Sequence, residues 1–131
     1  MRHIKLFTTD YLTLEYNVVD DYLSADWHGA VPNEAIVQGY EQILFYIQKE
    51  RSHKLLDNHY NVEGLWAYLS DWFALDWHPR AEAAGLEYHA AVYSKNYFSR
   101  LSTNQAINMV KSGIVKGFDT ARDAENWLRL M

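Results

Sequence analysis

From residue 30 onward, the sequence alternates between stretches with a helical repeat and short apolar stretches typical of strands. The helical stretches cover residues 32–51, 62–84, 94–111 and 120–131, and the strand-like stretches cover residues 53–57, 86–93 and 114–118. Such alternation favours parallel strands joined by helical crossovers, with the helices covering the sheet. A chain of 131 residues is also long enough to bury its own core. We therefore expect a single α/β domain over residues 1–131.

The first thirty residues have a different pattern. In residues 12–17, Leu12, Leu14 and Tyr16 alternate with polar side chains, and residues 22–28 alternate in the same way. A repeat of two residues is typical of strands, and the short polar segment between the stretches predicts an antiparallel hairpin. Residues 4–7 are expected to add a short strand before it. The predicted fold class is thus α/β, a mixed sheet with an antiparallel N-terminal hairpin followed by parallel β-α units.

Several residues predict where helices begin and end. Asn61 is a good N-cap for the helix expected over residues 62–84, and Ser94 and Thr120 suit the starts of the last two helices. Pro79 is expected to kink or break the helix that contains it, because proline lacks the backbone N–H. Asn58 and His59 are expected to lie on the surface just before that helix.

Composition excludes several classes of protein. The chain has no cysteine, so it can form no disulfide and no cysteine-ligated zinc site. Its net charge is −5 with scattered basic residues, which argues against nucleic acid as a partner. The longest apolar run, residues 43–47, is too short to span a membrane, and the first residues do not resemble a signal peptide. The expected location is the cytoplasm.

Three stretches carry a resemblance to a known family. They are "DYLTLEYN" at residues 10–17, "ADWHG" at 25–29, and "DWFALDWHPRAEAAGLEYHAAVYS" at 71–94. Together with the order of elements and the acidic character, they resemble the STAS superfamily of bacterial anti-sigma-factor antagonists. The chain is most similar to a small bacterial subgroup that is itself similar to CRAL-TRIO lipid-transfer domains. The resemblance extends from about residue 11 to the end of the chain.

The resemblance implies a regulatory function. Members of this family mostly bind proteins, and some bind small ligands. In the antagonists, a Ser or Thr after an Asp at a strand-to-helix junction is phosphorylated and switches partner binding. The matching position here follows Asp57, where residues 58–63 contain no Ser or Thr. We therefore expect a non-enzymatic cytoplasmic domain that binds a protein partner without the usual phosphorylation switch.

The carboxyl ends of the parallel strands are the expected binding edge, since ligands of open α/β sheets bind there. The candidate residues at this edge are His28, Asn58, His59, Tyr60, Asn61, Ser94, Asn96 and Asp119. Helix capping is the alternative explanation for the Asn and Ser side chains among them. No catalytic constellation, metal-ligand spacing or cofactor motif is present, so we expect no enzymatic activity, no metal and no cofactor.

Aromatic side chains make up 15% of the chain, including 5 Trp and 10 Tyr. They are expected to build the core, an interface, or a cavity that carries a small apolar ligand. The candidates for a cavity or patch are Phe45, Tyr46, Trp66, Trp72, Phe73, Trp77 and Tyr97. Exposed rings would instead favour a protein partner, and a homodimer is expected if Phe45, Tyr46, Tyr68 and Leu75 form one patch.

Overall fold

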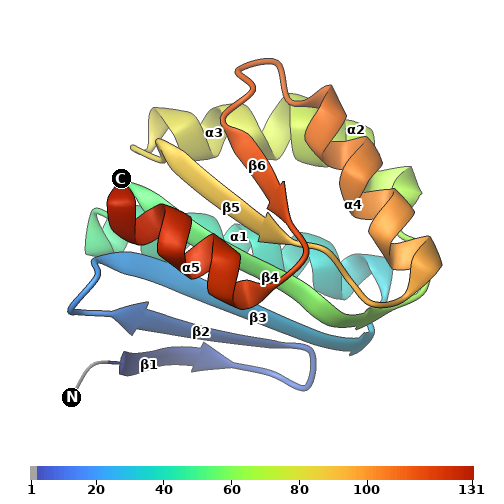
Figure 1. Cartoon of the computed structure of the whole chain (residues 1–131). Coiled ribbons are helices and arrows are strands. Elements are labelled where there is room, and N and C mark those ends of the chain that lie inside the picture. Colours follow the sequence, from blue (N-terminus) through green and yellow to red (C-terminus); the bar gives the residue numbers. More distant parts are fainter. Residues whose placement is uncertain (1–2) are drawn as a thin grey trace.

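A computed structural model describes residues 3–131, and six strands of this range form one mixed sheet (Figure 1). The strands lie side by side in the order in which they occur along the chain. They are β1 (His3–Thr8), β2 (Leu12–Asn17), β3 (Tyr22–Ala30), β4 (Lys54–Glu63), β5 (Tyr88–Val92) and β6 (Val115–Phe118). β1, β2 and β3 pair antiparallel, whereas β3, β4, β5 and β6 pair parallel. The predicted mixed α/β sheet and its N-terminal hairpin are confirmed.

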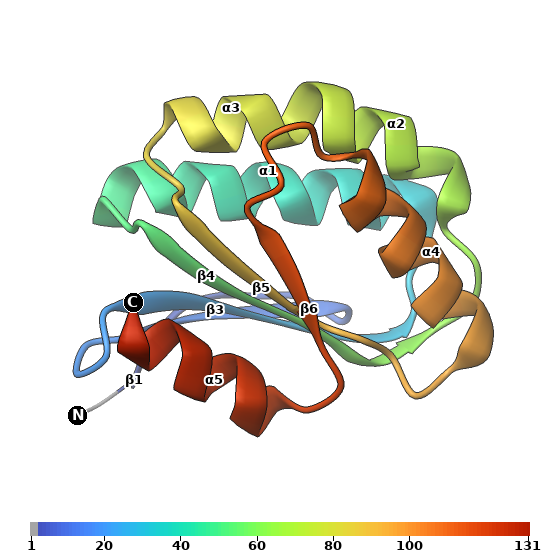
Figure 2. The same cartoon turned by 45° about the horizontal axis from the view of Figure 1, so that its top comes forward.

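The helices divide unequally between the two faces of the sheet. Those described are α1 (Asn33–Glu50), η1 (Ala67–Leu69), α2 (Ser70–Trp72), η2 (Phe73–Trp77), α3 (His78–Ala83), α4 (Tyr97–Met109) and α5 (Ala121–Leu130). Figure 2 shows α1, α2, α3 and α4 together on one face, with α5 on the other. Within residues 3–131, no helix combines the length and the apolar character needed to cross a membrane.

Residues 67–83 form one helical run whose geometry changes along its length. It begins as a 3₁₀ turn, continues as α-helix, widens to a π-helix in η2 and returns to α-helix in α3. The backbone N–H of His78 bonds to the carbonyl of Phe73, five residues earlier. Pro79 follows immediately and has no N–H to continue the ladder. The helix therefore widens before Pro79 instead of breaking there.

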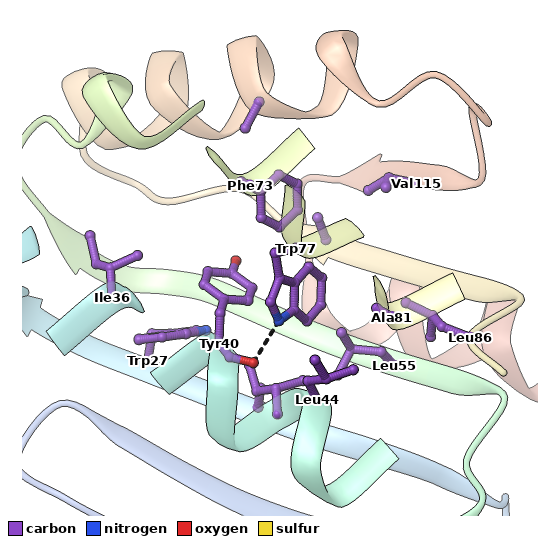
Figure 3. Packing of buried hydrophobic residues seen from close by; sticks show 14 of the residues in the cluster. Trp27, Ile36, Tyr40, Leu44, Leu55, Phe73, Trp77, Ala81, Leu86 and Val115 are labelled. Carbon is purple, nitrogen blue, oxygen red and sulfur yellow. Dashed lines mark hydrogen bonds between the residues drawn. The ribbon is translucent and has the colours of Figure 1, made fainter. Parts of the chain in front are cut away.

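The main core lies between the sheet and the larger helical layer. Trp27 from β3, Tyr40 from α1 and Trp77 from η2 are each almost completely buried there (Figure 3). Trp77 Nε1 donates to the backbone carbonyl of Tyr40 at 2.6 Å, so the buried indole N–H has a hydrogen-bond partner. A smaller cluster on the opposite face packs Leu128 of α5 against Leu56 of β4.

The main difference from the sequence-based expectation is the length of β4. It continues to Glu63, so Asn61 lies inside a strand and cannot cap a helix. The following helical run begins only at Ala67. The helix start predicted at residue 62 is therefore wrong. The apolar residues within 62–66 belong to the end of β4 and the segment after it, and not to a helix. Of the other predicted caps, Thr120 is confirmed, since its side chain accepts from the Asp123 N–H.

The third predicted cap is displaced by two residues. Asn96 caps α4 by accepting from the Ser99 N–H at 3.1 Å. Ser94 lies in the preceding loop, where its hydroxyl donates to the Val62 carbonyl and accepts from the Asn96 N–H. Both residues thus have structural partners.

Candidate functional site

A buried carboxylate forms the centre of the polar groups inside the core. Asp57 lies on β4 with 1% of its surface exposed. Its Oδ1 accepts from Trp27 Nε1 at 2.9 Å and from His59 Nε2 at 3.1 Å. Its Oδ2 accepts from the Tyr40 hydroxyl at 2.8 Å and from His89 Nε2 at 3.0 Å. Four hydrogen bonds satisfy both oxygens, which is the condition for burying a charge without a metal.

The hydrogen bonds continue from Asp57 towards solvent. His89 Nδ1 lies 3.0 Å from His78 Nε2, and the two rings are parallel with centroids 5.2 Å apart. His78 Nδ1 lies 2.6 Å from Glu82 Oε2, which also accepts from the Ser112 hydroxyl at 2.9 Å. Glu82 is 30% exposed and lines a surface pocket of about 280 Å³. A buried acid is therefore connected to the surface through two fully buried histidines.

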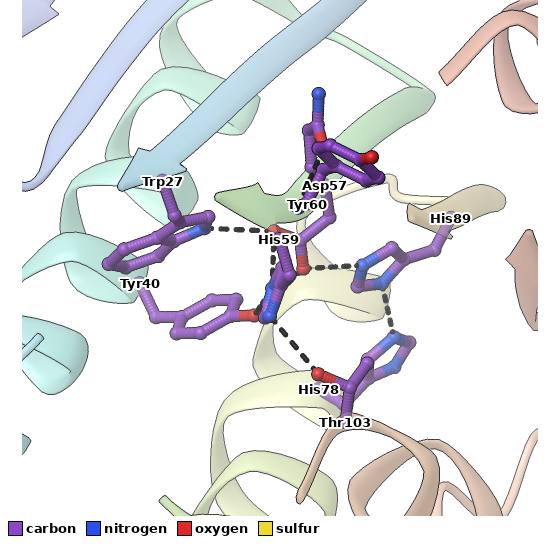
Figure 4. A network of polar contacts seen from close by, with 9 residues as sticks. Trp27, Tyr40, Asp57, His59, Tyr60, His78, His89 and Thr103 are labelled. Atoms are coloured by element: carbon purple, nitrogen blue, oxygen red, sulfur yellow. Dashed lines mark hydrogen bonds and ion pairs between the residues drawn. The ribbon is translucent and has the colours of Figure 1, made fainter. Parts of the chain in front are cut away.

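A second branch joins Asp57 to α4. His59 Nδ1 lies 3.2 Å from the Thr103 hydroxyl, and its Nε2 also lies 3.0 Å from the Tyr40 hydroxyl. Figure 4 shows His59, Tyr40 and Trp27 on one side of Asp57, and His89 and His78 on the other. We call the whole set the Asp57 network; its members are Trp27, Tyr40, Asp57, His59, His78, Glu82, His89, Thr103 and Ser112.

Burial and neighbouring charge shift the titration of this network. Burial raises the pKa of Asp57, but the positive charge and hydrogen bonds of His59 and His89 outweigh it, so that pKa lies well below its ordinary range. Burial, followed by the charges on Asp57, raises the pKa of Tyr40, so its hydroxyl keeps the proton that it donates. Burial and the charge on His89 lower the pKa of His78 to about 4.

A β-bulge explains how β4 directs its polar side chains into the core. Asp26 of β3 pairs with Asn58, but His28 pairs with Asn61, so β4 contains one extra residue at this point. Asp57 before the bulge, His59 within it and Val62 after it all face the helical layer. The bulge thus changes which alternate residues face the core.

The expectation that His59 is on the surface is wrong, because it is 4% exposed and bonded within the network. The sequence contained a signal for this in the alternation of Leu55, Asp57 and His59, which continues a strand with one inward face. Polar residue types obscured it, since Asp and His are rarely buried without partners. Their partners come from distant parts of the chain and could not be paired by sequence alone. His78 and His89 were likewise missed.

The structure brings several of the other candidate residues to the carboxyl edge of the parallel strands. His28 and Asn61 are neighbours in the register of β3 and β4. The Lys95 N–H donates to the Tyr60 carbonyl at 3.2 Å, and Asp119 pairs with Arg100 of α4 at 2.7 Å. Asn58 lies before the bulge, and its Oδ1 accepts from the Tyr60 N–H at 3.0 Å. Several candidate residues therefore do lie at the carboxyl edge of the sheet, whereas Asn58 and His59 lie earlier along β4.

Exposed apolar side chains gather beside this edge. The Ser102 hydroxyl accepts from the Trp66 N–H and donates to the Phe98 carbonyl, which holds the segment before η1 against the first turns of α4. We call the exposed residues of these segments the edge patch: Tyr60, Leu65, Tyr68, Tyr97, Phe98 and Leu101. Their exposed fractions range from 44% at Tyr60 to 75% at Tyr68. Large exposed apolar groups on neighbouring segments are typical of a contact with another molecule.

Most of the remaining aromatic candidates belong to the core. Trp66, Phe73 and Trp77 are each at most 4% exposed, and the rings of Phe73 and Trp77 stack with centroids 5.4 Å apart. Trp72 is partly buried, and its ring centroid lies 6.4 Å from that of Tyr40. A cavity of about 10 Å³ lies beside Trp66 and Phe73. That volume holds about one water molecule, far less than a small apolar ligand needs.

The residues considered for a homodimer patch have different surroundings. Phe45 and Tyr46 contact each other on α1, and the Tyr46 hydroxyl donates to the carbonyl of Leu6 in β1. Leu75 lines the pocket that contains Glu82, whereas Tyr68 belongs to the edge patch. Only Tyr68 of these four residues thus belongs to the edge patch.

No protein-family model, curated protein or solved structure matches this chain. Within residues 3–131, no three His, Asp or Glu side chains are grouped so that they could hold a metal ion.

Proposed function

We propose that this chain is a non-enzymatic, cytoplasmic, STAS-like domain that binds a protein partner through the edge patch. The observation that carries the proposal is the exposure of Tyr97 and Phe98, at 67% and 58%, on the helix beside the carboxyl edge of the sheet. Aromatic side chains are enriched at protein interfaces and contribute most of the energy there. The partner is accordingly a protein with a complementary apolar surface.

Two features favour a binding domain over an enzyme or a carrier. Asp57 has all its acceptor positions occupied and is closed off from solvent, so it has no free lone pair with which to act as a general base. The small cavity beside Trp66 supports close packing of the core rather than a ligand chamber. Both features leave the surface as the place for recognition.

The same region supports a domain without the phosphorylation switch. Between Asp57 and Leu69 the sequence has no Ser or Thr, and the first Ser after them, Ser70, is completely buried. A kinase could not reach Ser70 without unfolding the helical run. Regulation, if the domain is regulated, must therefore use another group.

A photo-crosslinking amino acid tests the proposal directly. Placed at Tyr97 in cells that express the chain, it is expected to yield one dominant crosslinked protein, which is either a second copy or another chain. Placed at Phe45, which is 51% exposed outside the edge patch, it is expected to yield none. The change Phe98→Ser should abolish the crosslink from Tyr97 without changing the urea midpoint. Equal crosslinking from Tyr97 and Phe45 would count against the edge patch.

A further inference from the structure

The Asp57 network connects α4 and the turn after it through the core of the protein. It starts at Thr103 in α4, passes through His59, Asp57, His89 and His78, and reaches Glu82. From Glu82 it returns to Ser112, three residues after the end of α4. Its central contact, between His78 and His89, joins α3 to β5. The helical run formed by residues 67–83 and the sheet are thus linked by a buried polar bond.

Counting protons along this path gives the charge of the histidine pair. Three hydrogen bonds lie in series between the carboxylates of Asp57 and Glu82, and each requires one proton. Two neutral imidazoles supply only two protons. The third must be an extra proton, and it remains on a ring because imidazole is ordinarily more basic than a carboxylate. One of the two rings is therefore an imidazolium.

The burial of the two carboxylates indicates which ring carries the charge. His89 contacts Asp57, whose carboxylate is buried, whereas His78 contacts Glu82, whose side chain is 30% exposed to water. With both of its nitrogens protonated, His89 donates to Asp57 and to His78 Nε2. His78 is then neutral and donates from Nδ1 to Glu82. Every ring nitrogen is satisfied in this arrangement.

We propose that the His78–His89 pair is a pH-sensitive link that holds the helical run to the sheet with one extra proton and opens when a second proton enters. The second proton can bind only at His78 Nε2, because the other three ring nitrogens already carry hydrogen. Two N–H groups would then face each other across 3.0 Å, and the hydrogen bond between α3 and β5 would be lost. The pKa of His78 is lowered to about 4, which agrees with binding of the second proton in acid.

Other titratable and charged groups surround the link. Those that face it are Asp57 and His59 on β4, Tyr40 on α1, Glu82 on α3, and Lys111, which lines the pocket with Glu82. On the same helical run, Arg80 pairs with Glu41 and Asp76 on the exposed side. The negative charges of Asp57 and Glu82 favour binding of the first extra proton to the histidine pair. The positive charge on His89 opposes binding of a second proton at His78.

The proton count is tested by nitrogen NMR of the histidine rings at pH 7. We expect both nitrogens of His89 and Nδ1 of His78 to be protonated. Glu82→Ala removes the outer acceptor, so His89 should lose one proton and His78 should change to the Nε2–H tautomer. Glu41→Ala, a comparably exposed carboxylate outside the network, should leave both rings as in the wild type. An unprotonated nitrogen on wild-type His89, or the same change in both variants, would overturn the proposal.

Opening of the link is tested by hydrogen exchange, with rates corrected for the intrinsic effect of pH. Between pH 6 and pH 3.5, protection of amides in α3 and α4 should fall at least tenfold more than protection in α5, which lies on the other face of the sheet. An equal loss in all three helices would mean global unfolding and would contradict the link. The link does not depend on the proposed function. Phe98→Ser should abolish crosslinking but leave the histidine signals unchanged, so the two proposals can fail separately.

Discussion

Replacing Asp57 by alanine is the most direct perturbation of the buried network. The change leaves four donors without the carboxylate, but Tyr40 and His59 can still bond to each other, since their polar atoms are 3.0 Å apart. Trp27 Nε1 and His89 Nε2 have no such alternative. A buried polar group left without a partner costs about 1–3 kcal/mol, so two of them cost about 4 kcal/mol. That loss is a large part of the stability of a typical domain, about 5–15 kcal/mol.

The asparagine variant makes the test specific. Asp57→Asn keeps the shape and one acceptor oxygen, which can serve Trp27 and His59, while its amide meets Tyr40 and His89. We expect a smaller loss of about 2 kcal/mol, because only part of the acceptor set is removed. The control is Asp26→Ala, an exposed carboxylate on the neighbouring strand, which should change stability by about 0.5 kcal/mol or less.

Equilibrium unfolding in urea at pH 7 measures all three variants. The expected order of the free energy of unfolding is wild type and Asp26→Ala together, then Asp57→Asn, then Asp57→Ala. If Asp57→Ala loses no more than about 1 kcal/mol, the carboxylate is not the acceptor that organises these donors. If asparagine costs as much as alanine, charge rather than hydrogen bonding is the main contribution.

The remaining predictions concern pH, capping and packing. The pKa of His78 is lowered to about 4, so as the pH falls the unfolded chain binds a proton at this residue before the folded chain does. The free energy of unfolding should therefore rise by about 3 kcal/mol from pH 4 to pH 6.5. His78→Gln should flatten this dependence on pH in urea melts. Asn96→Ala should cost about 1 kcal/mol through loss of the α4 cap, whereas Asn61→Ala, exposed in a strand, should change urea stability by about 0.5 kcal/mol or less. Gly39→Ala should lower thermal stability by about 1–3 kcal/mol, because the new methyl group would overlap the Trp27 ring.

The sequence was sufficient to predict the order of elements and the mixed sheet. Strand and helix repeats are set by local backbone geometry, so the alternation after residue 30 could be interpreted directly. The start of α5 could be predicted for the same reason, because a capping residue and its partner are three residues apart. These features depend on neighbours in the sequence.

The candidate site depends on contacts between distant residues, and the sequence predicted much less of it. Asp57 and His89 are 32 residues apart, and Thr103 is 44 residues from His59. No local pattern reports such pairs. The bulge in β4 also changes the inward face without a glycine or proline to mark it. Sequence reasoning therefore placed the edge of the sheet correctly but assigned His59 to it, when its partners lie in the core.

The π-helical turn in η2 lets the helical run hold one extra residue without changing which side chains face the core. A single residue rotates an α-helix by about 100°, and the wider turn absorbs that rotation. Removing the half-exposed Leu75 would therefore let the turn close to regular α-helix, while Phe73 and His78 keep their relative direction. In an alignment of related chains, a one-residue gap at this position is therefore compatible with the buried link wherever both histidines are present.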